Sequence, residues 1–178
     1  MQNHDPLAGL SIADVVEALV GKMYEPPLAG LREKVNALPD PLKVLILVSD
    51  FDTEVLMNGI TGFLENLTGK NLLATIEAFE VIGATSTAAT LRDIEATMRH
   101  YGVTHKMLRQ PMASVEEFSI VSSSTLYDQK IVDMLQAITK RASDLYLYQT
   151  PPSEAIFELL CQYLEPRRAE LLQAASAA

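Results

Sequence analysis

Three acidic side chains alternate along one short segment, Asp50-x-Asp52-x-Glu54. In an extended chain all three would share one face, where their carboxylates would suit a divalent cation. In a helix only Asp50 and Glu54 are neighbours, because they are four residues apart, and Asp52 points away. The calcium-loop pattern fails too, since no glycine and terminal glutamate follow at the required spacing. A solvated acidic face is the favoured interpretation. A partner-facing acidic patch and a metal or acid/base site are the alternatives.

Few other residues are candidates for catalysis or metal binding. His100 and His105 are five residues apart, which is not the i, i+4 spacing of a zinc-protease helix. Ser122-Ser123-Ser124 lacks the G-x-S-x-G elbow and is interpreted as a linker and helix cap. Cys161 is the only cysteine, so an intrachain disulfide and a cysteine-based zinc site are excluded. The chain also lacks a phosphate-binding glycine loop and a dinucleotide fingerprint. We therefore predict no catalytic residue, no metal and no cofactor.

The charge of the chain is strongly negative and unevenly distributed. The 178 residues carry a formal net charge of −9. Residues 1–91 contain 12 acidic and 5 basic side chains, whereas residues 92–178 contain 11 and 9. This balance argues against direct binding of nucleic acid or of an anionic membrane.

The length and composition indicate one globular, mainly helical domain. Hydrophobic residues make up 48% of the chain, enough for a sizeable core, and tryptophan is absent. The longest aliphatic run, residues 44–48, is far shorter than the ~20 residues of a membrane span. The first twenty residues contain no lysine or arginine, so no signal peptide is predicted and a cytoplasmic location is expected.

Periodic apolar residues and capping signals place the helices. They predict an all-α fold in a single compact domain of about six to eight helices, with no substantial sheet. Residues 1–10 are expected to form a flexible arm, residues 11–165 the helical domain, and residues 166–178 a frayed helical tail. Ser124 is the expected cap of the helix that carries Ile131 to Ile138, and Gly83 is an expected left-handed cap. Only residues 118–121 read like a strand, and they have no evident pairing partner.

The long apolar segment from Leu42 to about Leu67 contains two glycines, Gly59 and Gly62. Each glycine inside a helix costs about 1 kcal/mol relative to alanine. Two structural explanations are open. Either a neighbouring helix approaches closely at the two glycines, or Asn58-Gly59 breaks the segment into two helices at a tight corner.

The same segment resembles the core signature of a bacterial family of DNA-mimic proteins, formerly a domain of unknown function. The resemblance covers residues 40–105 well and rests on two strings, Glu54 to Gly69 and Glu77 to Ala84. The positions that match or mark the signature are Glu54, Asn58, Gly59, Gly62, Phe63, Asn66, Gly69 and Gly83.

The resemblance implies an all-helical, often dimeric protein that imitates DNA towards a basic DNA-binding regulator. Duplex DNA carries one charge per ~1.7 Å of axis, so a mimic needs several carboxylates on one solvated surface. The candidate partner-binding residues are Asp50, Asp52, Glu65, Glu77, Glu80, Asp93 and Glu95, to which Asp14 and Glu17 could be added.

Two other functions are weighed against this one. A pocket around Gly59, Gly62 and Phe63 would make the protein a helical module for a small ligand or peptide. A metal-assisted hydrolase would use Asp50, Asp52 and His105. The leading hypothesis is an acidic interaction protein that binds and sequesters a basic DNA-binding protein.

Overall fold

The computed structural model describes residues 7, 9–26, 28–114, 123–145 and 154–177, and helices form all the regular structure in these ranges. The helices with eight residues or more are α1 (Ile12–Gly21), α3 (Asp40–Glu65), α4 (Leu72–Ile82), α5 (Thr85–His100), α6 (His105–Met112), α8 (Gln129–Arg141), α9 (Ile156–Leu164) and α10 (Arg168–Ser176). Shorter segments are α2 (Ala29–Glu33), α7 (Ser123–Leu126), η1 (Val35–Ala37), η2 (Leu67–Asn71), η3 (Ala142–Leu145) and η4 (Glu165–Arg167). The prediction of one compact all-α domain is confirmed.

Two further expectations concern membranes and strands. None of the described helices combines the length and the apolar character that crossing a membrane requires. The strand-like residues 118–121 lie outside the described part of the chain.

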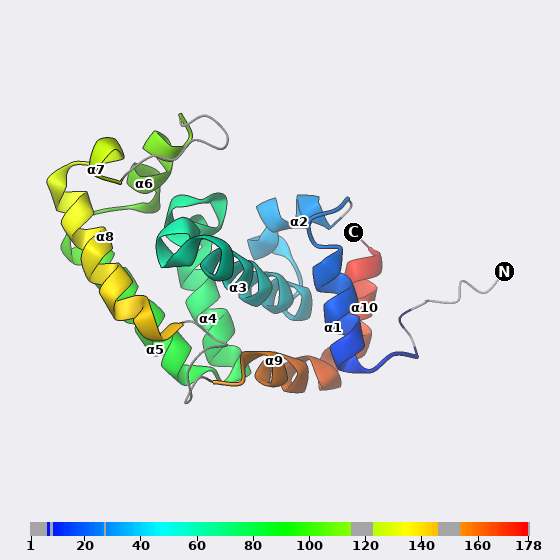
Figure 1. Ribbon diagram of the computed structural model, residues 1–178. Helices are drawn as coiled ribbons and strands as arrows, with labels where there is room; N and C mark the ends of the chain where they lie inside the picture. Colours follow the sequence, from blue (N-terminus) through cyan, green and yellow to red (C-terminus); the bar gives the residue numbers. More distant parts are fainter. Residues whose placement is uncertain (1–6, 8, 27, 115–122, 146–153, 178) are drawn as a thin grey trace.

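Helix α3 is the centre of the fold. Its aliphatic run, residues 44–48, is buried on every side, as expected of a helix that other elements surround. Helices α1, α4, α6, α8 and α10 all contact α3. In Figure 1, α1 and α10 lie on one side of α3 while α5 and α8 lie on the other. The core includes the fully buried ring of Phe51, which packs edge-to-face against Phe63 at 5.0 Å and Phe79 at 5.1 Å.

Gly59 breaks α3 into two parts. Its φ of 69° and ψ of −177° are not helical, and this conformation strongly favours glycine. The tight-corner explanation of the glycine pair is therefore correct. Gly62 lies just beyond the corner, where an added Cβ would be 2.1 Å from the Cβ of Asn58. The close approach at Gly62 thus comes from the same helix and not from a neighbouring one.

Capping residues explain where several helices begin and end. Ser11 and Asp14 form a capping box at the start of α1. Gly83 ends α4 in a left-handed conformation with φ of 87°, as predicted. The start of α8 differs from the prediction. Asp128, not Ser124, is its N-cap, and the Asp128 carboxylate accepts a hydrogen bond from the Ile131 backbone N–H at 2.9 Å. Ser124 belongs to the preceding short helix, α7.

The C-terminal segment, expected to fray, forms helix α10 and packs against α3. The apolar side chain of Leu171 is fully buried there, which explains why the helix is held in place. The guanidinium of Arg168 also donates hydrogen bonds to the carbonyls of Leu7 and Leu10. The C-terminal helix is thereby hydrogen-bonded to Leu7 and Leu10, at the described end of the expected N-terminal arm.

Candidate functional site

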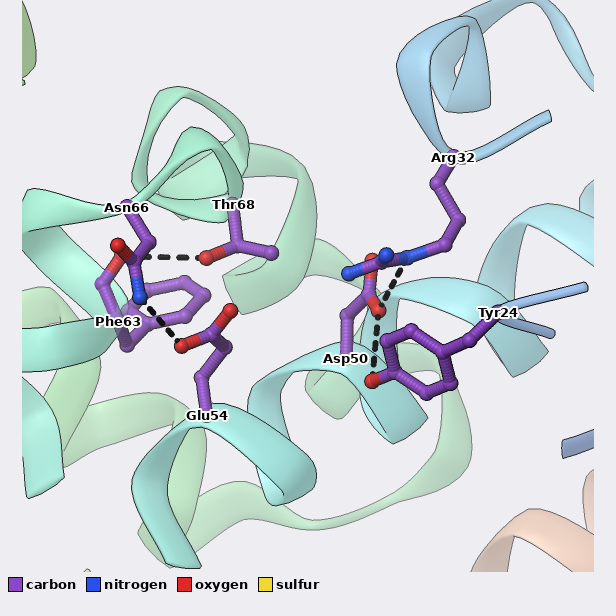
Figure 2. A network of polar contacts seen from close by, with 7 residues as sticks. All are labelled: Tyr24, Arg32, Asp50, Glu54, Phe63, Asn66 and Thr68. Carbon is purple, nitrogen blue, oxygen red and sulfur yellow. Dashed lines mark hydrogen bonds and ion pairs between the residues drawn. The ribbon is translucent and has the colours of Figure 1, made fainter. Parts of the chain in front are cut away.

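The corner at Gly59 brings Glu54 and Asn66 together. In a straight helix these residues would lie about 18 Å apart along the axis, because each residue rises 1.5 Å. Here the Asn66 side-chain amide donates a hydrogen bond to the Glu54 carboxylate at 2.7 Å, as Figure 2 shows. The Asn58 amide donates to the same Glu54 oxygen at 3.4 Å. Glu54 and Asn66, both in the signature, therefore hold the bent form of α3.

The turn after α3 passes very close to the end of that helix. A Cβ at Gly69 would lie 2.5 Å from the Leu64 carbonyl oxygen and 2.8 Å from that of Phe63, so only glycine fits without moving backbone. Nearby, Nε2 of His105 lies 2.8 Å from the Asn66 carbonyl oxygen. Because a carbonyl only accepts, this nitrogen carries the proton. His105 thus joins α6 to the turn.

Asp50 is part of a buried polar contact between α3 and the segment before it. Only 5% of the residue is exposed, and its carboxylate accepts from Nε of Arg32 at 2.7 Å and from the Tyr24 hydroxyl at 3.4 Å (Figure 2). The Arg32 guanidinium also stacks over the Tyr24 ring at 4.3 Å. Burial raises the pKa of Asp50, and the charge of Arg32 opposes this rise. Asp50 therefore does not belong to an exposed acidic face.

Two pockets lie near the signature residues. One, of about 390 Å³, has a lining that includes Arg32, Lys70, Arg109, Glu33, Asp50 and Glu54. These opposite charges balance, so the pocket does not favour an ion of either sign. The other pocket, of about 340 Å³, lies beside Gly59 and is lined by Thr139 and Ala142 on its far side. Gly62 and Phe63, expected to line a ligand pocket there, are buried and do not line it.

The proposed metal constellation of Asp50, Asp52 and His105 is not assembled. Asp50 lines the charged pocket, and Asp52 lines a separate groove between α1, α3 and α9. The ring of His105 is instead hydrogen-bonded to the Asn66 carbonyl oxygen, in the turn after α3. Across the described residues, no group of three or more histidine, cysteine, aspartate or glutamate side chains is arranged to hold a metal ion.

Asp52 and Glu65 are half-buried carboxylates on α3. In each side chain one oxygen is buried and has no hydrogen-bond partner in the described structure, namely Oδ1 of Asp52 and Oε1 of Glu65. Burial raises the pKa of both carboxyl groups. These two acids are thus less exposed than the predicted partner-binding surface requires.

The other predicted acids lie mostly on the surface, and arginines neutralise three of them. Glu80 pairs with Arg92 at 2.5 Å, and Asp93 pairs with Arg141 at 2.5 Å. Glu95, which is half-buried, pairs with Arg99 at 3.4 Å. Of the seven predicted residues, Glu77 alone is exposed and without an ion pair among the described side chains.

A different set of carboxylates is both exposed and free of such pairs. Glu17 on α1, Glu158 on α9 and Glu165 in η4 form no ion pair with any described lysine or arginine. All three lie close enough to Cys161 to affect it. Burial raises the pKa of the Cys161 thiol, and the charges of Glu158, Glu165 and Glu17 raise it further. We call Glu17, Glu158 and Glu165 the α1–α9 acidic face.

Sequence reasoning singled out Glu17 but missed Glu158 and Glu165. The available signal was the absence of basic residues, because residues 11–21 and 154–166 contain five carboxylates and no lysine or arginine. Asp14, one of the five, belongs to the capping box of α1, and a second, Glu154, also has a structural role. Its carboxylate accepts from the backbone N–H of Ser86 at 2.7 Å and of Thr87 at 2.8 Å, and so caps the start of α5.

Comparison with known proteins places this arrangement in a family. Searches of curated proteins and of solved structures found no match. A family model described as DMP19-like protein matches residues 36–167, a wider range than the signature strings alone. The matched range contains α3, its corner at Gly59, and the Glu54–Asn66 contact. The chain therefore belongs to the DMP19-like protein family, the family of DNA-mimic proteins that its signature resembles.

Proposed function

We propose that this protein is an acidic interaction protein that binds a basic DNA-binding protein and keeps it from DNA. The observation that supports this function most directly is the α1–α9 acidic face, whose three carboxylates are exposed and carry no basic partner among the described residues. Family membership supports the same function. The role is binding and not catalysis, and we place it in the cytoplasm.

The physical basis is competition for a cationic surface. Lysines and arginines that bind DNA gain free energy because they release counterions from the phosphates. A carboxylate can take the place of a phosphate only if its charge reaches the partner. Glu80 and Asp93 are paired with Arg92 and Arg141, whereas Glu158 and Glu165 form no ion pair with a described lysine or arginine. The α1–α9 acidic face therefore attracts a basic partner more strongly.

The experiment compares two double variants with the same change in net charge. Glu158→Gln with Glu165→Gln removes charge from the α1–α9 acidic face, and Glu80→Gln with Asp93→Asn removes paired charge elsewhere. Each immobilised variant captures proteins from a lysate across a range of salt concentrations, and duplex DNA is then added as a competitor. We expect duplex DNA to release the captured protein. The first variant should weaken capture and flatten its salt dependence, and the second should change capture little.

Two results would contradict the proposal. One is a captured protein that duplex DNA fails to displace, because a DNA mimic and DNA must share a binding surface. The other is an unchanged salt dependence in the variant lacking charge at Glu158 and Glu165.

A further inference from the structure

A groove of about 380 Å³ lies between α1, α3 and α9, next to the α1–α9 acidic face. Its apolar lining consists of Val16, Val20, Val48, Ile156, Phe157 and Leu160. Glu17, Ser49, Asp52 and Thr53 supply its polar groups. The groove is thus mainly apolar and has two carboxylates, and no lysine or arginine of the described residues lines it. This size falls in the range of about 300–1,000 Å³ that is usual for ligand sites.

Asp52 is the unusual group in this groove. Its Oδ1 is buried and receives no hydrogen bond from the described protein groups, and no ion pair involves this residue. Burying a charge without a partner is costly, and accordingly burial raises the pKa of Asp52. Asp50, two residues earlier, pairs with Arg32, whereas no described lysine or arginine pairs with Asp52. A cation entering the groove would therefore relieve an existing cost.

The chemistry of the lining indicates which kind of cationic group fits the groove. An anionic ligand would meet Glu17 and Asp52, and a purely apolar ligand would leave the Asp52 charge buried without a partner. An arginine side chain combines an apolar stem with a planar cation that is weakly hydrated and donates in parallel to carboxylates. The half-buried ring of Phe157 adds a surface on which a guanidinium can stack.

We propose that the groove between α1, α3 and α9 receives an arginine side chain of the basic partner, with its guanidinium at Asp52 and Glu17 and its stem along the apolar walls. The choice of a partner's side chain over a free small molecule rests on the function proposed above. The groove adjoins the exposed carboxylates. The same partner would therefore be attracted by these charges at long range and held by the arginine side chain that it inserts.

A nuclear magnetic resonance titration of the full ¹⁵N-labelled chain tests the groove without any partner. The probes are a capped Ala-Arg-Ala peptide, the same peptide with neutral, nearly isosteric citrulline, the lysine peptide, and n-butylguanidine. We expect the arginine peptide to shift the amides of Val16, Val20 and Thr53. The citrulline peptide should bind about 10- to 100-fold more weakly, as expected for the loss of one charged hydrogen-bonded contact.

Variants assign this binding to named side chains. Asp52→Asn keeps the shape of the groove and should weaken binding of the arginine peptide by a similar factor. Glu77→Gln is the matched control, since Glu77 is an exposed carboxylate away from the groove lining and should leave the affinity unchanged. Phe157→Leu keeps the wall apolar and should reduce the preference for arginine over lysine, which provides a second test if the Asp52 variant folds poorly.

Several outcomes would overturn the proposal. They are equal binding of the arginine and citrulline peptides, unchanged affinity in Asp52→Asn, or no shifts in the groove. Binding of n-butylguanidine without the arginine peptide would make the groove a small-molecule site and also reject the assignment. Partner capture separates this proposal from the function. If the Asp52→Asn variant no longer binds the arginine peptide but captures the partner normally, the groove assignment fails while the proposed function stands.

Discussion

Two acidic regions of this molecule differ in whether their carboxylates are paired with arginines. Between α5 and its neighbours α4 and α8, the carboxylates of Glu80 and Asp93 each lie against an arginine of another helix. Between α1 and α9, the carboxylates of Glu17 and Glu158 have no such partner in the described structure. The number of acidic residues in a segment therefore does not predict a negative surface. The position of the arginines in space decides it.

The largest expected effect comes from the most buried of the paired carboxylates. Arg32→Met leaves the charge of Asp50 buried without its partner, and we expect the free energy of unfolding to fall by about 3 kcal/mol. Chemical denaturation measures this change. Adding Asp50→Asn should restore much of the loss, because the unpaired charge is then removed. A double variant no more stable than Arg32→Met would show that Arg32 acts through packing alone.

The corner of α3 separates the end of the helix that packs on α1 from the end that contacts α6. Gly59→Ala places a side chain at φ of 69°, which should lower the free energy of unfolding by about 2 kcal/mol. Thermal or chemical denaturation checks the value. Gly30→Ala is the matched control, since no atom lies within 4 Å of the added Cβ and its φ is ordinary. A Gly59 variant as stable as the Gly30 variant would contradict the need for this conformation.

Removing two surface arginines should make the first region resemble the second. Arg92→Gln with Arg141→Gln frees Glu80 and Asp93, and at surface sites each lost pair should cost only about 0.2–1 kcal/mol. Binding of a polyarginine peptide at low salt should increase and should fall again as salt is added. Lys106→Gln with Lys140→Gln makes the same charge change without breaking a described ion pair. If this control increases binding equally, net charge matters more than pairing.

The smallest expected effect concerns Asp52 and its dependence on pH. Because burial raises its pKa, the native state binds more protons than the unfolded state between the unfolded and native pKa values. This contribution to stability is therefore present at low pH and is lost as the pH rises through that window. Asp52→Asn should raise stability at pH 7, by no more than about 1 kcal/mol, and this gain should disappear in acid. A gain that is independent of pH would rule out relief of charge as its cause.

Much of the fold follows from local signals in the chain. Apolar spacing, the Ser11–Asp14 capping box and Gly83 place helices without any knowledge of their neighbours, because each signal acts within one or two turns. Competing local signals are harder to rank. Ser124 and Asp128 are both good caps, and the chain uses Asp128 for α8.

The candidate site was harder to predict because it depends on distances between helices. Asp50, Asp52 and Glu54 are close in sequence but have three different environments: a buried ion pair, an apolar groove and an amide contact across the corner. Glu158 was missed because no nearby motif marks it. The lack of lysine and arginine in residues 154–166 does not by itself show that Glu158 is unpaired, because an arginine of another helix could still pair with it.

The sequence alone determined the helical class, the approximate helix limits, the negative net charge and the family signature, because these depend on residue types and short-range spacing. Tertiary structure decided which carboxylates are paired, since helices distant in the chain bring arginines to Glu80 and Asp93, whereas no described arginine pairs with Glu17 or Glu158. It also decided that Gly59 is a corner, because only the folded chain shows the contact between Glu54 and Asn66 that the bend permits.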